Sequence, residues 1–420
     1  MPAAALACIR CGHELPLESY AERCPACAPQ VVAGLTVTYR DLAAPERAAL
    51  RDGPRSIWRY AHSLPVPAEK AVSLGEGMTP LVPLRAVGEE LGMGALFAKC
   101  EDDNPTGSFK DRLASSAISA AKELFGAETI ASSSTGNAGV AAAAYAARAG
   151  MRCVILTTAG ASPPMLTQML AFGAIVLTVP DKDARWTVLG RGVRDHGWYP
   201  TSPFFAPPTG SNPFGIEGYK SLAYENAEDL GWRVPDWMVI PVCYGDSLYG
   251  IWKGFRELEE LGWTTGMPRL VAAEIYGSLG AALAEGLEQV PMMQKSHETA
   301  AGSISAAQST YQALHALRHS GGAAVSVPEA AFHAARDDLG RREGMFLEES
   351  AACALAAVRQ MREDGRIGAD DVVVCLHTAD GLKTGIDTRA IAERTIPVPG
   401  DLDGAMATLL AAGGPDLRRA

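Results

Sequence analysis

The sequence has no long hydrophobic run, no excess of basic residues and few aromatic ones. No apolar stretch approaches the ~20 residues that a membrane-spanning helix requires. The first nine residues are apolar but carry no basic segment, so we expect no signal peptide and a cytoplasmic location. The formal net charge of −11 argues against nucleic acid or an anionic membrane surface as a partner. These absences leave a soluble globular protein as the expectation.

The composition fits that expectation. Apolar residues make up 48% of the 420 residues and charged residues 20%, which is enough apolar material for two or three domains. The sequence shows no internal repeat and no low-complexity linker. The tail after Arg394 contains glycine and proline, and its sequence leaves open whether it is ordered.

Four of the nine cysteines are concentrated near the N-terminus, as the CxxC pairs Cys8–Cys11 and Cys24–Cys27. Each pair predicts a tight turn that aims two thiolates at one point, and two such turns predict a tetrahedral Cys₄ zinc site. We interpret His13 as a surface residue. The alternatives are a ribbon that lacks metal and a redox dithiol, whose thioredoxin-like context is missing here. We expect the scattered cysteines to be free thiols: Cys100, Cys153, Cys243, Cys353 and Cys375.

From residue 95 onward, short apolar runs alternate with longer helical patterns. Repeated βα units predict an α/β fold with parallel sheets that are covered by helices. Ser108 is the expected N-cap of the first of these helices. We expect strands at 96–100, 129–132, 152–158, 175–179, 237–242, 270–275 and 372–376. We expect helices at 108–124, 138–149, 164–172 and 249–261.

The segment Glu101–Arg112, EDDNPTGSFKDR, places a lysine on the first turn of a helix. Both the positive end of the helix dipole and partial burial would lower the pKa of Lys110. A neutral amine is what a lysine needs to form a Schiff base. The alternative is an exposed Lys110 beside Asp111, which would be ordinary surface charge.

Three further segments lie where a predicted strand ends. Ser132–Gly139 (SSSTGNAG) offers backbone amides and hydroxyls to a phosphate or a carboxylate, although a simple helix cap would explain one hydroxyl. Val242–Leu248 (VCYGDSL) offers amides to a phosphate but is not a Walker motif. Leu376–Lys383 (LHTADGLK) places Thr378 at a strand's C-terminal end, where α/β sheets bind ligands. We interpret the neighbouring His377 as a structural residue rather than a general base.

Together these segments resemble the threonine synthase family, among the fold-type II, tryptophan synthase β-like enzymes that depend on pyridoxal 5′-phosphate (PLP). The resemblance covers roughly residues 70–385, and NPTGSFKDR together with STGN is its most specific part. The shared motifs are LGEGMTPL (74–81), NPTGSFKDR (104–112), STGNAG (134–139), SNPFGIEG (211–218), GIWKGF (250–255) and TADGLK (378–383).

The resemblance implies a two-domain α/β enzyme, and some members of the group also carry an N-terminal zinc ribbon. We assign residues 1–30 to the ribbon. Residues 31–94 and 208–420 would form the larger, PLP-binding domain, and residues 95–207 a smaller mobile domain. The resemblance also implies a homodimer that acts on a small amino-acid substrate.

The family's roles transfer to this chain position by position. Lys110 would form the Schiff base with PLP and move protons, with Phe109 beside the cofactor. Asn137 would bond the cofactor's 3′-oxygen, and Thr378 would face its pyridine nitrogen and leave that nitrogen largely unprotonated. The residues implied to bind the cofactor phosphate are Cys243, Tyr244, Gly245, Asp246 and Ser247. Those implied to lie at the substrate carboxylate are Ser134, Thr135, Gly136 and Ala138.

The chain departs from the family mainly where the substrate's phosphate would bind. Ala138 stands where a threonine is usual. In the segment Thr209–Gly218, Gly215 replaces an arginine that binds phosphate in the family, and we expect Gly215→Arg to raise the use of phosphorylated substrates. The cofactor-phosphate loop is altered as well. Asp246 would repel a phosphate unless its side chain points away or is protonated.

Two activities therefore stay open. In the first, Lys110 removes the α-proton of an amino acid and a β-group leaves, which gives either a 2-oxo acid with ammonia or, by β-replacement, a new amino acid. In the second, the chain is a true threonine synthase that converts O-phospho-L-homoserine to L-threonine and phosphate. Its relocated anchor would be Lys182, Arg185 or Arg191. A protein that binds PLP without turnover is a third alternative.

Overall fold

The computed structural model describes residues 3–18, 23–27, 31–40, 44–385, 395–398 and 400–413. The chain divides into two units, Met1–Lys383 and Thr384–Ala420. The second unit contains one described helix, α14 (Leu402–Ala411), none of whose residues is buried. No helix in the described part of the chain has the length and apolarity needed to cross a membrane.

The larger sheet is built from strands that are apolar almost throughout. Its order is β12-β11-β10-β13-β5-β4, and all neighbours are parallel except β4 and β5. Alternate residues of one strand enter opposite cores, with Met238 and Ile240 on one side and Trp237 and Val239 on the other. Burial on both faces explains why these runs are continuous. The strands are β4 (Leu81–Pro83), β5 (Leu96–Cys100), β10 (Trp237–Pro241), β11 (Arg269–Glu274), β12 (Ala323–Ser326) and β13 (Val373–His377).

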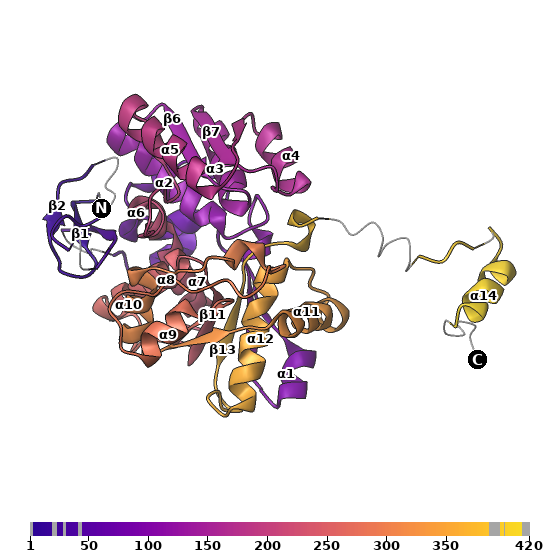
Figure 1. Cartoon of the computed structure of the whole chain (residues 1–420). Coiled ribbons are helices and arrows are strands. Elements are labelled where there is room, and N and C mark those ends of the chain that lie inside the picture. The colour runs from indigo at the N-terminus through magenta and orange to yellow at the C-terminus, as the bar shows by residue number, and fades with distance from the viewer. Residues whose placement is uncertain are drawn as a thin grey trace. The chain divides into compact units, whose positions relative to one another are not determined.

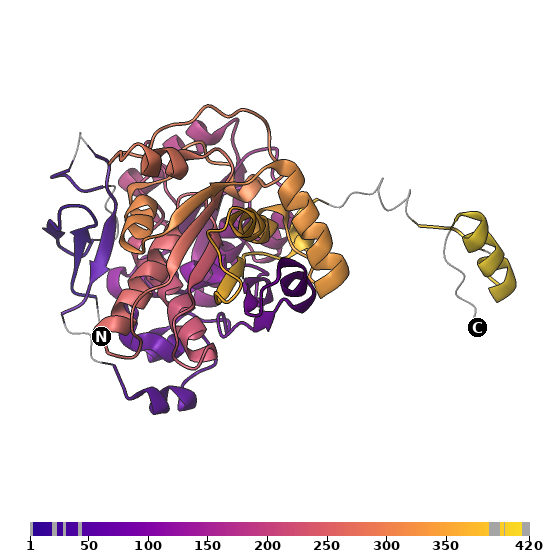
Figure 2. The ribbon, with the colours of Figure 1, turned by 90° about the horizontal axis from the view of Figure 1, so that it is seen from below.

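Helices cover both faces of this sheet (Figure 2). The core around Met238 also takes residues from α7 (Lys220–Asp229), α8 (Asp246–Glu260), α9 (Ser278–Ala284) and α10 (Tyr311–His319). The opposite core takes residues from α1 (Arg85–Leu91), α11 (Glu329–Asp338) and α12 (Glu349–Glu363).

The smaller sheet has the order β8-β7-β6-β9 and is entirely parallel. One face, with Ile130 and Ile155, packs on α2 (Lys110–Phe125), α3 (Asn137–Ala149) and α4 (Pro163–Ala171). The other packs on α5 (Lys182–His196) through Trp186 and Leu189 (Figure 1). The strands are β6 (Thr129–Ser133), β7 (Arg152–Thr157), β8 (Ile175–Thr178) and β9 (Tyr199–Pro200).

All the predicted strands and helices are present, with ends shifted by at most three residues. Ser108 is not the N-cap of its helix, because α2 begins at Lys110 and Phe109 precedes it without a side-chain cap. The strand at 96–100, which we placed in the smaller domain, pairs with β13 in the larger sheet. The division into two domains otherwise stays a prediction.

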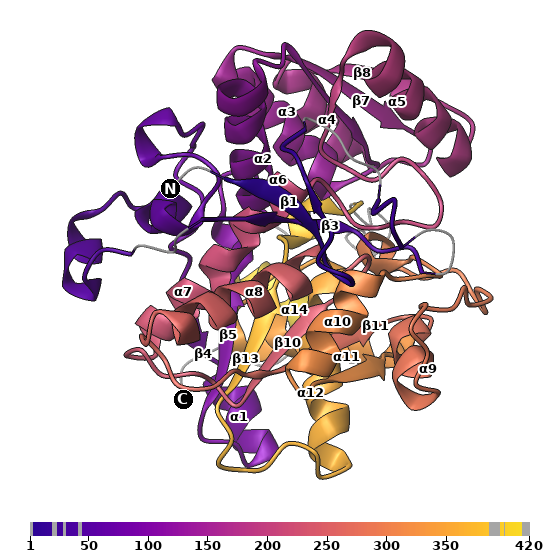
Figure 3. The same cartoon turned by 90° about the vertical axis from the view of Figure 1, so that its left-hand side faces the viewer.

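The N-terminal segment forms a third, antiparallel sheet with the order β2-β1-β3, seen from its own side in Figure 3. Its strands are β1 (Ala5–Cys8), β2 (Glu14–Leu15) and β3 (Leu35–Thr38), so the sheet extends past residue 30. Leu6 and Val37 pack against Phe214 of the short helix α6 (Pro213–Ile216). Lys253 Nζ of α8 donates to Val37 O at 2.6 Å and ties the sheet to the rest of the chain.

The topology brings three of the singled-out segments to one edge. β5, β13 and β10 are adjacent and parallel, so their carboxyl ends meet. Residues 101–110, 378–383 and 243–247 follow these three ends. The chain continues from β10 to β11 on one side and returns with β13 on the other, and such a reversal of strand order is where open α/β sheets bind their ligands.

Candidate active site

Lys110 begins α2, and the residues that follow it are fixed in the core. Asp111 accepts hydrogen bonds from Thr106 N at 2.7 Å and Thr106 Oγ1 at 2.5 Å. Arg112 is 0% exposed and forms an ion pair with Glu101 at 2.6 Å. Lys110 itself is half-buried and Asp111 is fully buried and bonded, so Lys110 is not a surface lysine beside a free aspartate.

The Lys110 amine lies among aromatic rings. Its Nζ is 4.1 Å from the ring centroid of Phe109 and 5.7 Å from that of Tyr219, and these two rings stack at 5.3 Å. Nζ has no hydrogen-bond partner among the described residues, and burial lowers the pKa of Lys110. The acidic groups whose ionised forms would oppose this shift are Asp246, Cys243 and Glu348. The environment therefore favours the neutral amine that Schiff-base chemistry requires.

The segment after β13 runs antiparallel to the turn before Lys110. Phe109 N donates to Thr378 O at 3.0 Å, and Asp380 N donates to Gly107 O at 3.1 Å. Lys383 Nζ donates to Thr106 O and closes the same contact from the other end. Thr378 is thereby held beside Lys110 by backbone bonds.

His377 is fully buried, and neither ring nitrogen has a hydrogen-bond partner within the described residues. Burial lowers its pKa to about 4, so the ring is neutral at physiological pH. A structural histidine normally has hydrogen-bonded ring nitrogens, so the structural interpretation of His377 stays a prediction.

Some polar groups of the loop before α3 are hydrogen-bonded within the protein. Ser134 N donates to Leu156 O at 3.0 Å, and Gly136 N donates to Ser134 Oγ at 3.1 Å. Thr135, Gly136 and Ala138 stay partly exposed. Backbone amides at the start of a helix have no partner inside that helix, so this end of α3 suits an anion.

Asn137 is the first residue of α3, and its amide is only half satisfied. Nδ2 donates to Glu348 Oε2 at 3.0 Å, whereas Oδ1 is buried and has no partner in the described part of the chain. A buried amide oxygen without a partner leaves one acceptor that a bound ligand could complete.

Glu348 is the functional candidate that sequence reasoning missed. It immediately precedes α12, is buried, and its backbone N donates to Ala379 O at 3.2 Å. Burial raises the pKa of Glu348, and its charge in turn raises the pKa of Lys110. Glu348 thus joins the start of α3 to the segment after β13 beside Lys110. The segment MFLEES has two adjacent glutamates, and nothing in its spacing distinguishes Glu348 as a site residue.

The loop 243–247 leads from β10 into α8 and depends on a glycine. Gly245 has φ +76°, and a Cβ there would collide with Ala313 Cβ. Thr310 Oγ1 donates to Tyr244 O at 2.6 Å and fixes the turn. The N-terminus of this 15-residue helix presents backbone amides of the kind that bind phosphate.

The sequence predicts that Asp246 would repel a phosphate at this loop. In the structure its carboxylate accepts three hydrogen bonds. Oδ1 accepts from Ser211 N at 3.0 Å and from Gln312 Nε2 at 2.6 Å, and Oδ2 accepts from Ser211 Oγ at 2.6 Å. These three neutral donors hold the carboxylate toward residues 211 and 312 and tie the loop to residue 211, but they leave its negative charge in place.

These residues fit a PLP cofactor. Lys110 offers an amine with a lowered pKa, Asn137 offers an unpartnered buried oxygen, and the N-terminus of α8 offers amides to a phosphate. The fold brings all three to the carboxyl ends of the parallel strands.

Gly215, where the family has an arginine, is sealed against α2. A Cβ at this position would lie 2.8 Å from Leu113 Cγ and 3.2 Å from Ala117 Cβ. We therefore correct our expectation for Gly215→Arg, because the new side chain would displace α2 before it could bind a phosphate. Gly210 is equally constrained, because its φ is +112° and a Cβ there would collide with Gln312 Nε2.

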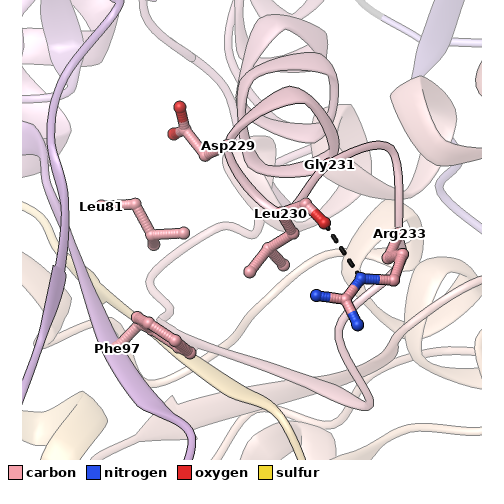
Figure 4. A pocket seen from close by; sticks show the side chains of 6 residues that line it. All are labelled: Leu81, Phe97, Asp229, Leu230, Gly231 and Arg233. Atoms are coloured by element: carbon pink, nitrogen blue, oxygen red, sulfur yellow. Dashed lines mark hydrogen bonds between the residues drawn. The ribbon is translucent and has the colours of Figure 1, made fainter.

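A cleft of about 510 Å³ lies elsewhere, between the edge of the larger sheet and the end of α7 (Figure 4). Two of its polar groups are bonded within the protein: Arg233 Nε donates to Leu230 O at 3.2 Å, and Asp229 pairs with Lys99 at 3.0 Å. The residues that line it are Leu81, Phe97, Asp229, Leu230, Gly231 and Arg233, and none is a predicted site residue.

The four N-terminal cysteines converge. The Sγ atoms of Cys8 and Cys27 are 3.6 Å apart, those of Cys11 and Cys24 are 3.7 Å apart, and all four lie within 4.8 Å of one another. A tetrahedral zinc with bonds of ~2.3 Å to sulfur has edges of about 3.8 Å between sulfurs, which the distances within these two pairs match.

The match to known proteins extends over most of the chain. The family model described as "Pyridoxal-phosphate dependent enzyme" matches residues 72–379. The threonine synthase of Methanocaldococcus jannaschii is 32% identical over 404 residues, which cover 94% of this chain and 97% of that protein. The threonine synthase of Halalkalibacterium halodurans is 35% identical over 338 residues, with 78% and 90% covered.

Solved structures share the fold at lower identity. Maize serine racemase has a TM-score of 0.64 at 19% identity and covers 75% of this chain and 90% of its own. Threonine deaminase isoform 2 from Solanum lycopersicum has a TM-score of 0.64 at 19% identity, with 89% and 94% covered. From its motifs, its fold and its relatives, the chain belongs to the threonine synthase family of fold-type II, pyridoxal-phosphate dependent enzymes.

Proposed function

We propose that this PLP-dependent lyase acts on an amino acid by removing the α-proton and releasing a group from the β-carbon. The observation that carries the proposal is the Lys110 amine, whose pKa is lowered by burial, beside Asn137, Glu348 and the segment of Thr378. The sealed Gly215 supports a reaction that does not use the family's substrate-phosphate anchor.

The chain's residues would divide the work as follows. Lys110 Nζ would hold the cofactor and then accept the α-proton of the substrate. Ser134, Thr135 and Gly136 would hold the substrate carboxylate, and Asn137 would orient the ring through its 3′-oxygen. PLP, when bound, would supply the electron sink that stabilises negative charge at the α-carbon. Elimination of water from serine followed by hydrolysis gives pyruvate and ammonia, and capture by a nucleophile gives a new amino acid.

The second candidate is threonine synthesis from O-phospho-L-homoserine. It is favoured by curated relatives of that activity at 30–35% identity. It needs an anion anchor other than Gly215.

A product assay on the PLP-loaded protein separates the two candidates. We expect ammonia from L-serine, L-threonine or 3-hydroxyaspartate under the first. Threonine and free phosphate from O-phospho-L-homoserine would establish the second. Lys110→Ala serves as the control, and product formed by this variant would contradict the role of Lys110.

We further propose that Cys8, Cys11, Cys24 and Cys27 hold a structural zinc ion. The proposal rests on the sulfur spacing and on backbone amides that point at a thiol, with Arg10 N at 3.3 Å from Cys8 Sγ. Metal analysis of the purified protein should find one zinc per chain.

A cytoplasmic homodimer completes the proposal. The compartment is supported by the free state of the cysteines outside the cluster. The dimer is supported by the family resemblance, and sedimentation of the purified protein would test it.

A further inference from the structure

The first turns of α5 carry two cations toward the cofactor loop. Lys182 Nζ lies 5.5 Å from the ring centroid of Tyr244 and 4.3 Å from that of Trp186. Arg185 is half-buried and lies three residues after Lys182 on α5, so the two side chains are on the same side of the helix. Both cations therefore face the residue that follows Cys243 in the loop.

Neither cation has an acidic partner. Within the described part of the chain, Lys182 and Arg185 form no ion pair, and Arg185 Nε is buried without a hydrogen bond. Burial lowers the pKa of Arg185, whereas the Lys182 side chain is exposed. A partly desolvated guanidinium without a partner is unfavourable unless an anion completes it.

The same helix provides a contrast. Arg191, the third anchor considered from the sequence, is exposed and pairs with Asp195 at 3.1 Å. Asp181 caps the helix through Ala184 N at 2.8 Å, and Asp183 lies beside Lys182 as an exposed first-turn carboxylate. The unpaired charge on α5 is thus confined to the end that faces the loop.

The position relative to Lys110 follows from the loop 243–247. Lys182 approaches the ring of Tyr244 in this loop, and the loop follows β10, whose neighbour β13 leads to Thr378 beside Lys110. The cations are therefore next to the site of proton transfer but arrive from the smaller sheet, whereas the loop 243–247 and Lys110 follow strands of the larger one.

We propose that Lys182 and Arg185 bind a second anionic group of the substrate, distal to the α-carbon, in place of the arginine that Gly215 replaces. The inference rests on the proposed function, because it names the substrate class of the same site. The ligand chemistry is a phosphate or a carboxylate, which a guanidinium binds through two parallel hydrogen bonds. Amino acids with a neutral side chain would leave both cations unpaired.

Binding rather than turnover tests this inference. Calorimetry on the PLP-loaded protein would compare O-phospho-L-serine and L-aspartate with L-serine, in the parent and in R185Q, K182Q and R191Q. Loss of one charge-assisted contact is expected to weaken binding of the anionic ligands by about 10- to 100-fold in R185Q. Binding of L-serine should stay unchanged, and R191Q should behave as the parent.

The two anionic ligands distinguish the sources of the charge. An R185Q effect on O-phospho-L-serine alone assigns the site to phosphate, and an effect on L-aspartate alone assigns it to carboxylate. An equal loss for L-serine would overturn the inference in favour of a structural role. A loss of PLP affinity in R185Q and K182Q would overturn it by placing the cofactor's own phosphate there. A parent protein that takes up no PLP would instead overturn the proposed function.

Discussion

At the scale of single residues, the site depends on two groups whose pKa values are shifted in opposite senses. Burial lowers the pKa of Lys110 and raises that of Glu348, so burial favours the neutral form of each. When Glu348 ionises as the pH rises, its negative charge stabilises the ammonium form of Lys110 and raises the pKa of the amine. The groups that face Glu348 are Asn137, Ser303, Lys110, Lys383 and Glu349.

Glu348→Gln should remove the effect of a charge at residue 348 on the pKa of Lys110. The variant keeps a polar partner for Asn137 but never becomes charged, so the midpoint for capture of PLP by Lys110 should move to lower pH. The measurement is the cofactor absorbance change after PLP is added to the cofactor-free protein across the pH range. Glu349→Gln is the matched control, because Glu349 pairs with Arg336. Identical profiles for Glu348→Gln and the parent would show that the charge of Glu348 does not affect the pKa of Lys110.

Gly215→Ala tests how tightly α2 is packed against the segment 209–218. The new methyl group would lie 2.8 Å from Leu113 Cγ, so we expect a loss of about 1–3 kcal/mol in the free energy of unfolding. Chemical denaturation measures it. Gly94→Ala is the control, because a Cβ at Gly94 meets nothing within 4 Å. Equal stability of the two variants would contradict the sealed position.

At the scale of elements, the start of α2 is held by a buried charge network rather than by a helix cap. Arg112 pairs with Glu101 at 2.6 Å and Glu225 at 2.5 Å, and all three are at most 1% exposed. Lys99 pairs with the same Glu225 at 3.1 Å. The network joins β5, α2 and α7 at the start of α2, where Lys110 lies. The position of Lys110 is therefore set before any ligand binds.

Arg112→Met should leave the buried Glu101 without its cation and leave Glu225 with Lys99 alone. Breaking a buried pair in this way costs about 3–5 kcal/mol, so the unfolding midpoint should fall sharply. Arg366→Met is the matched control, because the pair of Arg366 with Asp364 is solvent-exposed and contributes about 0–1 kcal/mol. A small effect of Arg112→Met, comparable to the control, would show that the network does not position α2.

Elements were the part of this fold that sequence patterns predict best. Apolar runs such as 237–241 and 269–274 are readable because burial on both faces requires continuous apolar residues. The sheet to which a strand belongs is less readable, since β5 pairs with β13 from nearly the other end of the chain. The contact between Asn137 and Glu348 could not be predicted for the same reason. The two residues are distant in sequence, and only the fold brings them together.

At the scale of the whole molecule, residues 32–39 of the N-terminal segment contact the segment 209–218 and Gln289. Tyr39 OH donates to Glu217 Oε2 at 2.9 Å, and Val32 N donates to Gln289 Oε1 at 3.0 Å. Gly34 lies so close to Thr209 that a Cβ there would be 2.6 Å from its carbonyl oxygen. The CxxC spacing predicted the cysteine cluster, but these contacts with distant residues could not be read from it.

Cys11→Ser separates metal binding from packing. Cys11 is exposed, whereas Cys8, Cys24 and Cys27 are buried, so this substitution removes a ligand with little loss of apolar contact. Because binding energy at a structural zinc site is also folding energy, the variant should bind less zinc and unfold at least about 2 °C lower than the parent. Metal analysis and thermal unfolding check both expectations. A chelator should lower the unfolding temperature of the parent but not of the variant. If the chelator acts equally on both, the stability of this sheet does not come from a metal held by the four thiols.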